Sequence, residues 1–309
     1  MKIKNVVLIG RGAVGAVYAA AFDDARSKVE GLNFRVAADC ERRVRYESEP
    51  FIFNHKPYFF DYFTPHATHE KVDLVIIATK WGGYAAALDT IEPIVDRHTV
   101  ILPLLNGLKA YDVARERFAD SDVLRGFYLG HTASRGQNNE TAQDGMYRTN
   151  FGQEINSTPY SPTVQSVAEL FDAANIKYRI PEDMVAAAWG KFVINIGTNL
   201  PTGLYKYNYG ELKSSPSAME LSVALMREAA AIATARQISG AEKLVDNALK
   251  TFDILQDEDY SSMAQDTVAG RETEIEIFAG EVIKMGRELH LPTPRTDEFY
   301  TTFRQRLEV

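Results

Sequence analysis

A glycine-rich turn near the start of the chain restricts the possible folds more than any other feature. The apolar run Val6–Ile9 predicts a strand buried on both faces, and an alanine-rich helical pattern, Ala16–Phe22, follows shortly after it. Between them stand Gly10, Arg11, Gly12, Ala13, Val14 and Gly15. Glycines at this GxGxxG spacing permit a tight turn, close approach of a pyrophosphate and close helix–strand packing. We therefore predict a dinucleotide-binding domain in which these six residues bind the cofactor.

Three further predicted strands end in polar residues. The strands are Phe34–Ala38, Val72–Ala78 and Thr99–Leu105, and they are followed by Asp39, by Thr79-Lys80 and by Asn106-Gly107. The carboxyl ends of strands line the ligand crevice of a doubly wound parallel sheet, so Asp39, Lys80 and Asn106 are candidate cofactor contacts. The alternatives are a solvated turn residue, a surface lysine and a structural Asn-Gly turn, respectively.

Asp39 bears on the choice between NAD and NADP. An acidic residue at the end of the second strand accepts hydrogen bonds from the adenosine ribose hydroxyls and disfavours a 2′-phosphate, which favours NAD. Arg42 and Arg43 follow closely and could neutralise such a phosphate, which leaves NADP open.

A largely apolar helical pattern, Ala187–Leu200, carries polar residues at steps of four. Lys191, Asn195 and Asn199 lie along one side of the predicted helix, among large apolar residues. An unpaired lysine or amide in apolar surroundings costs several kcal/mol, so this polar stripe needs partners or a bound ligand. A network satisfied within the protein is the alternative.

The two halves of the chain have different periodicities. Strands and helices alternate in the first half, where we expect short, glycine-punctuated strands in Val123–Phe151 to extend the edge of the sheet. Helical patterns follow in the second half, including Ile275–Leu289, which Pro292 and Pro294 end. The predicted fold class is α/β: an N-terminal Rossmann-type doubly wound domain, residues 1–180, and an all-α C-terminal domain, residues 181–309.

Composition and charge exclude several functional classes. The net charge of −8 over 309 residues gives no indication of nucleic-acid binding. The single cysteine, Cys40, precludes an intrachain disulfide and indicates a reducing compartment. The apolar stretch Gly12–Phe22 is too short to span a bilayer, so we expect a cytoplasmic protein without a membrane partner. His66 and His69 have no third ligand in view, and no metal is expected.

Several spaced signatures extend over essentially the whole chain. They are the glycine motif, Thr79-Lys80, Asn106-Gly107, Trp189-x-Lys191-x₃-Asn195-x₃-Asn199, Ser261-Ser262-Met263-x-Gln265-Asp266 and Gly270-Arg271-x-Thr273-Glu274-Ile275. Together they resemble the ketopantoate reductase (2-dehydropantoate 2-reductase) family, within the 6-phosphogluconate dehydrogenase-like superfamily. The resemblance implies NAD(P)H-dependent reduction of the ketone of a small 2-oxo acid, 2-dehydropantoate to pantoate in pantothenate biosynthesis, by a homodimer. It also implies that the helical domain, residues 181–309, binds the substrate and mediates dimerisation.

The same resemblance implies roles for individual residues. Lys191 is the catalytic proton donor, Glu274 is its acidic partner and Lys80 contacts the cofactor. The residues placed at the 2-oxo acid are Asn106, which also lies near the nicotinamide, Asn195, Asn199 and Ser262. The structural alternatives are that Glu274 pairs with Arg271 and that Ser262 caps a helix.

Two positions depart from the family pattern. NADPH-dependent members carry arginine where Asp39 stands, and a glutamine precedes Asn-Gly where Leu105 stands. The family default is NADPH whereas Asp39 favours NADH, so the expected cofactor is NADP or NAD. The alternatives are an NAD-dependent reductase of another bulky 2-oxo acid, of the D-mandelate dehydrogenase type, and a non-catalytic dinucleotide-sensing protein.

Overall fold

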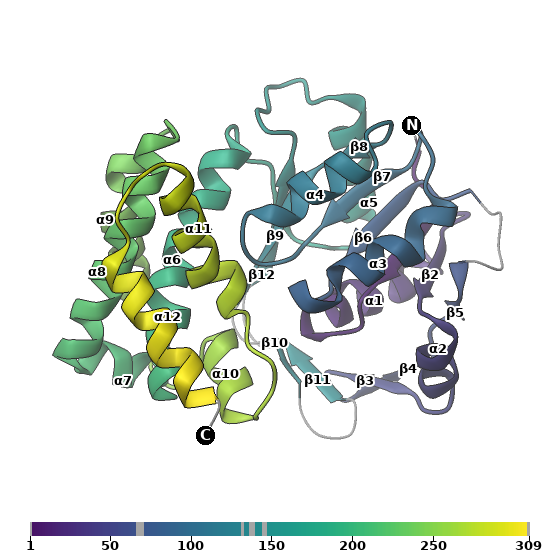
Figure 1. The fold of residues 1–309 in the computed structure, drawn as a ribbon. Helices are drawn as coiled ribbons and strands as arrows, with labels where there is room; N and C mark the ends of the chain where they lie inside the picture. Colours follow the sequence, from purple (N-terminus) through teal and green to yellow (C-terminus); the bar gives the residue numbers. More distant parts are fainter. Residues whose placement is uncertain (1, 66–70, 131–132, 136–139, 144–146, 308–309) are drawn as a thin grey trace. The chain divides into compact units, whose positions relative to one another are not determined.

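The computed structural model describes residues 2–65, 71–130, 133–135, 140–143 and 147–307. The chain divides into two compact units, Met1–Met184 and Val185–Val309, which differ in architecture (Figure 1). The first unit combines parallel strands with helices, and the second is built from helices. Within the described ranges, no helix has both the length and the apolar character needed to cross a bilayer.

The first unit starts with a strand, a loop and a helix, and further strands and helices follow. In chain order its elements are β1 (Asn5–Ile9), α1 (Ala13–Ala25), β2 (Asn33–Ala37), α2 (Cys40–Glu47), β3 (Phe51–Phe53), β4 (Lys56–Tyr58), β5 (Tyr62–Phe63), β6 (Leu74–Ile77), η2 (Trp81–Gly83), α3 (Tyr84–Ile91), η3 (Glu92–Ile94), β7 (Val100–Pro103), α4 (Lys109–Arg117), β8 (Asp122–Val123), β9 (Arg125–Gly130), β10 (Ala133–Arg135), β11 (Glu140–Gln143), β12 (Tyr147–Gly152), α5 (Pro162–Ala173) and β13 (Tyr178–Arg179).

Six strands form a parallel sheet in the order β5-β2-β1-β6-β7-β8. The central strand β1 pairs in parallel with β2 on one side and with β6 on the other. The strand order reverses its direction between β1 and β6, at the switch point where doubly wound sheets bind their ligands. The sheet confirms the predicted Rossmann-type fold class.

Alternate residues of β1 face opposite layers of helices. Val6 and Leu8 belong to the core that also contains α1 and α5, whereas Val7 and Ile9 belong to the core that contains α3 and α4. A strand that is buried on both faces needs apolar residues at consecutive positions, which explains the unbroken run of four. Helices cover both faces of the sheet in Figure 1.

Two smaller sheets correct the prediction for residues 123–151. We expected strands that extend the edge of the main sheet, and β8 does extend it. However, β9 and β12 pair antiparallel and form a separate sheet with β13, while β10 and β11 join β3 and β4 in another. The prediction of strands was right, but the predicted pairing of these strands with the main sheet was wrong. A local pattern does not specify which distant residue will be the partner, such as Asn150 for Phe127.

The described part of the second unit is all-helical, as predicted for this half of the chain. Its elements are α6 (Met184–Tyr205), α7 (Tyr209–Ser214), α8 (Pro216–Ala235), η4 (Ala241–Lys243), α9 (Leu244–Phe252), α10 (Ser262–Val268), the π-helical turn η5 (Glu276–Gly280), α11 (Glu281–Glu288) and α12 (Pro294–Leu307). The predicted helix Ile275–Leu289 is therefore interrupted by a π turn. Pro294 begins α12, because a proline suits the first turn of a helix, where its missing N–H needs no partner.

The helix α6 continues past Pro201, although the helical pattern predicted an end at Leu200. Proline has no N–H, so the carbonyl of Gly197, four residues earlier, loses its helical partner. The Ser222 hydroxyl of α8 donates to that carbonyl oxygen at 2.7 Å. Gly197 also lets the two helices approach closely, because a Cβ at this position would lie 2.5 Å from the sulfur of Met226. α8 thus stabilises the part of α6 that proline would otherwise weaken.

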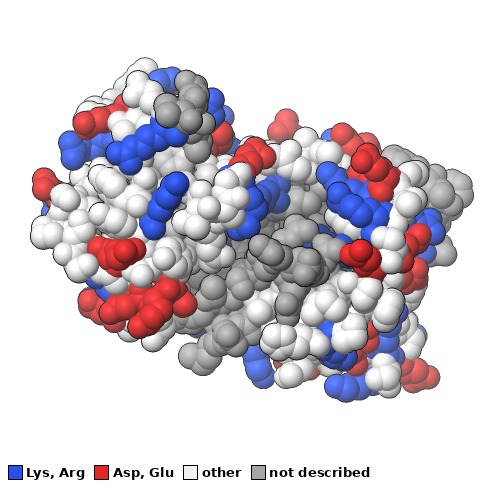
Figure 2. Space-filling model, turned by 90° about the horizontal axis from the view of Figure 1, so that it is seen from below, with Lys and Arg blue, Asp and Glu red and all other residues white. Residues whose placement is uncertain are grey.

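The surface of the described residues carries both signs of charge. In the face drawn in Figure 2, lysine and arginine groups alternate with aspartate and glutamate groups in small clusters. The chain as a whole has 34 basic and 42 acidic side chains. A surface of mixed sign produces a weaker long-range field than a surface of one sign, so it offers little steering toward a polyanion.

Candidate active site

The three glycines of the loop between β1 and α1 meet three different steric requirements. Gly10 has a φ of +100°, and a Cβ there would lie 2.5 Å from the carbonyl oxygen of Ala78, just after β6. A Cβ on Gly15 would overlap the carbonyl oxygen of Gly10, so this glycine lets α1 pack on the loop. Gly12, the N-cap of α1, has open space: apart from its chain neighbours, no described atom lies within 4 Å of an added Cβ. A phosphate at such a helix start would meet unpaired N–H groups.

The remaining residues of this loop contribute in two different ways. Ala13 and Val14 form the first turn of α1, where backbone N–H groups have no acceptor inside the helix. Arg11 instead directs its side chain into the protein, where it is 7% exposed and contacts Tyr46 and Tyr62. The sequence pattern gave no signal for this burial, because the aromatic partners come from distant segments.

Asp39 lies between β2 and α2, as expected at the carboxyl end of the second strand. It is the N-cap of α2: one carboxylate oxygen accepts the Arg42 N–H at 2.7 Å, and the other pairs with the Arg42 guanidinium at 2.9 Å. The side chain remains 47% exposed. Arg43 pairs with Glu47 at 2.7 Å. The two arginines that could neutralise a phosphate are therefore both engaged by carboxylates.

The strand β6 delivers Thr79 and Lys80 to the edge of the sheet that carries the glycine loop. Lys80 is exposed and precedes η2 as its N-cap. The Thr79 hydroxyl is buried, and it has no hydrogen-bond partner among the described residues. The Thr79 backbone nitrogen would lie 2.8 Å from a Cβ on Gly10, which places this residue against the loop. Since an unpaired buried hydroxyl costs about 1–3 kcal/mol, Thr79 is a ligand-contact candidate that the sequence patterns did not single out.

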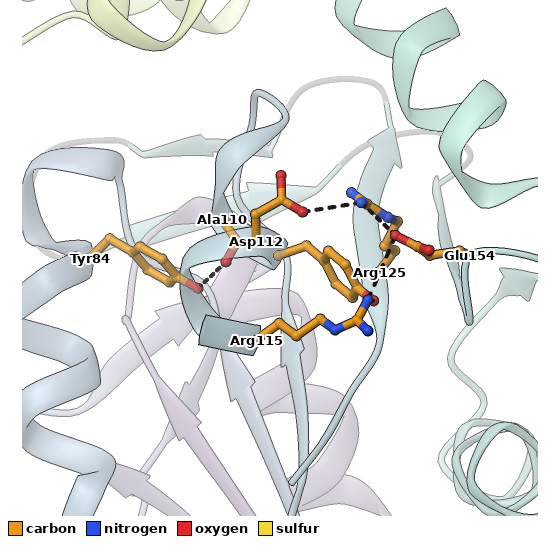
Figure 3. Close-up of polar contacts among 7 residues, drawn as sticks. Tyr84, Ala110, Asp112, Arg115, Arg125 and Glu154 are labelled. Carbon is orange, nitrogen blue, oxygen red and sulfur yellow. Dashed lines mark hydrogen bonds and ion pairs between the residues drawn. The ribbon is translucent and has the colours of Figure 1, made fainter. Parts of the chain in front are cut away.

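Asn106 and Gly107 follow β7 and precede α4 at the same edge. Gly107 has a φ of +82°, a conformation that favours glycine, and Asn106 is half-buried. The start of α4 is held from α3, because the buried Tyr84 hydroxyl donates to the carbonyl oxygen of Ala110 at 2.6 Å (Figure 3). This bond connects the segment after Asn106 to the helix that follows Lys80.

A network centred on Arg125 holds the body of α4 (Figure 3). Its guanidinium pairs with Asp112 at 3.2 Å and with Glu154 at 2.9 Å, and lies 3.9 Å from the centroid of the Tyr111 ring. Arg115 also approaches Glu154, at 4.0 Å. Exposed ion pairs contribute about 0–1 kcal/mol, but the Arg125 side chain is only 13% exposed and is enclosed by its partners. The network therefore restricts α4, and with it the preceding loop, more than a surface pair would.

In the second unit, α6 presents the predicted polar stripe. Lys191 and Asn195 are half-buried, and Asn199 is 3% exposed. Trp189 and Phe192, on either side of Lys191 in the chain, are buried. Of the three residues of the stripe, Asn199 is the most deeply buried.

The acidity of Lys191 differs from that of an ordinary lysine. Burial lowers the pKa of Lys191 from its ordinary 10.5 to about 8, while the negative charge of Glu274 opposes this shift. The reason is that desolvation disfavours the ammonium form and a nearby carboxylate favours it. A lysine with this pKa is mostly protonated at neutral pH and releases its proton more readily than a surface lysine. These are the properties of a general acid.

The two serines before α10 have different surroundings. Ser261 is the N-cap: its hydroxyl accepts the Ala264 N–H at 3.1 Å and lies 2.6 Å from the Thr202 hydroxyl of α6. Ser262 is exposed in the first turn of α10. The alternative in which Ser262 caps this helix is therefore wrong, and its role toward the 2-oxo acid stays a prediction.

An ion pair fixes the segment that leads to Glu274. The Arg271 Nε donates to the carboxylate of Asp266 at 2.9 Å, and the Arg271 N–H donates to the Asp266 carbonyl oxygen at 2.8 Å. Asp266 is 6% exposed, so this pair is more constrained than a surface pair. Glu274 itself is half-buried and stands shortly before the π turn η5. Such π turns frequently occur near functional residues.

These two units define the class of protein. A doubly wound sheet with a glycine loop is the architecture of a dinucleotide-binding domain, and a helical unit with a lysine whose pKa is lowered by burial follows it in the chain. Residues 6–155 match the family model described as "Ketopantoate reductase PanE/ApbA", and residues 183–307 match "Ketopantoate reductase PanE/ApbA C terminal". The chain belongs to the ketopantoate reductase family, which confirms the resemblance inferred from its motifs.

Relatives and solved structures extend over nearly the full length of the chain. The 2-dehydropantoate 2-reductase of Vibrio cholerae serotype O1 is 26% identical over 297 residues, which are 96% of this chain and 95% of the relative. The ternary structure of D-mandelate dehydrogenase with NADH and anilino(oxo)acetate has a TM-score of 0.83 at 18% identity, over 98% of this chain and 100% of that one. A dimeric ketopantoate reductase from Staphylococcus aureus has a TM-score of 0.76 at 18% identity, over 98% and 99%. Both structures share the fold of this chain.

The histidine pair considered as a metal site, His66 and His69, lies outside the described residues. Among the described residues, no group of three or more histidine, cysteine, aspartate or glutamate side chains could hold a metal ion.

Proposed function

We propose that this protein reduces the ketone of a 2-oxo acid, with 2-dehydropantoate as the substrate and pantoate as the product, and that Lys191 donates the proton. The observation that carries the proposal is the pKa of Lys191, which burial lowers to about 8 while Glu274 opposes the shift. A general acid is most effective when its pKa lies near the operating pH. Two relatives that match nearly the full length of the chain are both named 2-dehydropantoate 2-reductase, which supports the choice of substrate.

The proposed chemistry assigns two tasks to Lys191. When bound, the reduced nicotinamide supplies a hydride to the carbonyl carbon, and negative charge develops on the carbonyl oxygen. The Lys191 ammonium stabilises that charge and then transfers a proton to the oxygen, which completes the alcohol. Glu274 keeps Lys191 protonated and orients it, and solvent returns the proton to the neutral amine.

Substrate binding is proposed for the amides and hydroxyl around this lysine. Asn199 is 3% exposed, and a buried amide that is left unpaired costs about 1–3 kcal/mol, which a hydrogen bond to a bound ligand would remove. We assign the carboxylate and the distal hydroxyl of the 2-oxo acid to Asn195, Asn199 and Ser262. For Asn106, at the sheet edge of the first unit, we propose a contact with the nicotinamide.

We propose NADH as the preferred cofactor. The glycine loop and the exposed Lys80 would bind the phosphates, and Asp39 would accept hydrogen bonds from the ribose hydroxyls. The side chains of Arg42 and Arg43 pair with Asp39 and Glu47, so neither is available to a 2′-phosphate without breaking a pair. We further propose a cytoplasmic homodimer, consistent with the single cysteine and with the dimer named for the Staphylococcus aureus protein.

A second candidate is an NADH-dependent reductase of a different bulky 2-oxo acid, as D-mandelate dehydrogenase is. Asp39 favours this candidate, because it stands where NADPH-dependent members of the family carry arginine. The buried Leu105, which replaces a family glutamine beside Asn106, also favours a changed substrate pocket.

The test measures initial rates of NADH and NADPH oxidation, each with ketopantoate and with benzoylformate. Turnover of ketopantoate supports the first candidate, whereas faster turnover of benzoylformate with NADH supports the second. Cofactor binding without turnover over a broad panel of 2-oxo acids would mean a dinucleotide-sensing protein. Faster turnover with NADPH would contradict the role given to Asp39.

Variants then test the proton donor. Lys191→Ala should lower kcat by about 10²–10⁴-fold, the range for a lost general acid. Lys284→Ala is the matched control, because Lys284 is an exposed lysine in the same unit, paired with Glu288 at 3.6 Å. In the wild type, the rate of reduction should fall as the pH rises through about 8. In Glu274→Gln this fall should move to lower pH, since the charge that raises the pKa of Lys191 is lost. Near-normal turnover by Lys191→Ala would exclude this mechanism.

A further inference from the structure

We propose that Arg11 is a positioning residue for cofactor recognition: its buried guanidinium clamps the glycine loop to α2 and β5 and so sets the place of Asp39 relative to the loop. This inference rests on the proposed function, and it concerns a dinucleotide with a free 2′-hydroxyl. The GxGxxG motif requires only backbone from this position, so the motif itself assigns no task to the Arg11 side chain.

The contacts of Arg11 form an aromatic clamp, defined here as Arg11 with Tyr46, Phe51 and Tyr62. The guanidinium carbon lies 3.7 Å from the ring centroid of Tyr46, 4.9 Å from that of Phe51 and 5.5 Å from that of Tyr62. A guanidinium nitrogen donates to the Tyr62 hydroxyl at 2.6 Å. The Tyr46 and Tyr62 rings are themselves 5.5 Å apart. One side chain of the glycine loop thus joins α2, β3 and β5.

The charge of Arg11 is compensated in an unusual way. Arg11 is 7% exposed, and none of the described carboxylates forms an ion pair with its guanidinium. The Nε is buried without a hydrogen-bond partner among these residues. Aromatic faces offset part of the cost of burying a cation, but an apolar side chain would fill the same space without that cost. The arginine is therefore better explained by a task than by its contribution to stability.

That task follows from the weak attachment of α2. None of the eight residues of α2 is fully buried, so the helix has little core of its own. Tyr46, in its last turn, rests on Arg11, and Asp39 is its N-cap. A displacement of α2 therefore moves Asp39 relative to Gly12. The cofactor's diphosphate would lie at Gly12 and its adenosine ribose at Asp39. The clamp therefore sets the distance between Gly12 and Asp39, the two residues proposed to contact this end of the cofactor.

The experiment compares three variants by direct binding, with no 2-oxo acid present. Arg11→Met removes the charge and the hydrogen bond, and Tyr46→Ala removes the closest ring from a half-exposed position, so it tests the clamp even where Arg11→Met fails to fold. Arg45→Met is the matched control, because Arg45 is an exposed arginine whose guanidinium lies 5.3 Å from the same ring. The measurements are the Kd values for NADH and NADPH, from nicotinamide fluorescence, and the alkylation rate of Cys40.

Cys40 gives a readout that does not depend on activity. It is the single thiol of the chain, it is exposed, and it follows Asp39 directly. Bound NADH should slow its alkylation in the wild type and less so in the two clamp variants.

The expected result is a Kd for NADH that rises by about three- to thirtyfold in Arg11→Met and Tyr46→Ala, the range for loss of a cation–π contact. The preference for NADH over NADPH should fall at the same time, because Asp39 is no longer held in place. Arg45→Met should change neither value.

Three results would overturn the clamp. They are an unchanged Kd for NADH in both clamp variants, an equal weakening of both cofactors, and a selective loss of NADPH binding, which would mean that Arg11 contacts a 2′-phosphate directly. A wild type that binds neither dinucleotide would refute the proposed function as well. A wild type that binds and turns over normally, with variants that match it, would refute the clamp alone.

Discussion

Replacement of Lys191 by methionine should abolish turnover and yet stabilise the protein at neutral pH. Methionine keeps an unbranched side chain of similar length and removes the charge. The pKa of Lys191 is about 8 in the folded chain, below its ordinary 10.5. Between these two values the unfolded chain binds more protons at this residue than the folded chain does. The free energy of unfolding therefore rises with pH from about 8 to 10.5. Below pH 8 the protein bears the full penalty, which is the stability lost by burying the Lys191 ammonium.

The size of the penalty follows from the same two values. One pKa unit corresponds to about 1.4 kcal/mol. The difference between 10.5 and about 8 therefore lowers the free energy of unfolding by roughly 3 kcal/mol at pH 7. The attraction between Lys191 and Glu274 is already included, because Glu274 opposes the shift. Small differences in packing between lysine and methionine reduce the gain, so we expect Lys191→Met to be about 1–3 kcal/mol more stable at pH 7.

The assay follows urea unfolding of the second unit through one tryptophan. The chain has two tryptophans, Trp81 in the first unit and Trp189 in α6, two residues before Lys191. In a Trp81→Phe background, the emission of Trp189 reports on the helix that carries the substitution. Unfolding is measured at pH 7 and at pH 10.5, with and without Lys191→Met. The difference between the two proteins should be largest at pH 7 and small at pH 10.5.

Two results would refute this reasoning. One is a Lys191→Met protein that is less stable than its parent at pH 7, and the other is a stability difference that does not change with pH. Either result would mean that the ammonium is not desolvated at its place on α6. The proton-donor proposal would then lose the pKa on which it depends, even if turnover also disappeared.

Further predictions concern the glycine loop and the support of α6. Gly10→Ala should destabilise the first unit, because it combines a φ of +100° with a Cβ 2.5 Å from the Ala78 carbonyl oxygen, whereas Gly12→Ala should leave its urea midpoint nearly unchanged and weaken NADH binding. Urea unfolding followed through Trp81 in a Trp189→Phe background, together with NADH binding, checks both, and a severe loss of stability in Gly12→Ala would contradict the open space at that position. Ser222→Ala should cost about 1–3 kcal/mol, because it leaves the buried carbonyl of Gly197 unpaired. A change below roughly 0.5 kcal/mol, the size expected of a neutral surface substitution, would show that this bond is dispensable.

The features that the sequence predicted well are those set by neighbouring residues. The run Val6–Ile9 and the three loop glycines specify a strand, a tight turn and a helix within one short segment. The central sheet then follows, because a strand buried on both faces needs helices above and below it. The stripe of Lys191, Asn195 and Asn199 could also be predicted from the sequence, since positions four apart lie on one side of a helix.

The features that the sequence did not predict depend on distant partners. Pro201 is a local signal for the end of a helix, and α6 continues because Ser222 supplies the missing donor. Arginine is usually a surface residue, and the burial of Arg11 depends on Tyr46 and Tyr62, which come from other elements. Nothing in the sequence around Thr79 indicates that its hydroxyl is buried, and the structure shows that it has no hydrogen-bond partner among the described residues.

The supports of α6 explain how one helix can contain both a proline and the proposed proton donor. A general acid must be held within a fraction of an ångström of its productive position, which a flexible segment does not provide. Pro201 alone would weaken α6 on the C-terminal side of the polar stripe, where Asn199 stands. The Ser222 hydroxyl donates to the Gly197 carbonyl in place of the missing N–H, and the Met226 side chain of α8 lies close to Gly197. The spacing of Lys191, Asn195 and Asn199 is therefore maintained by residues of α8 that take no part in the proposed chemistry, which is why substitutions there should lower stability and substrate affinity together.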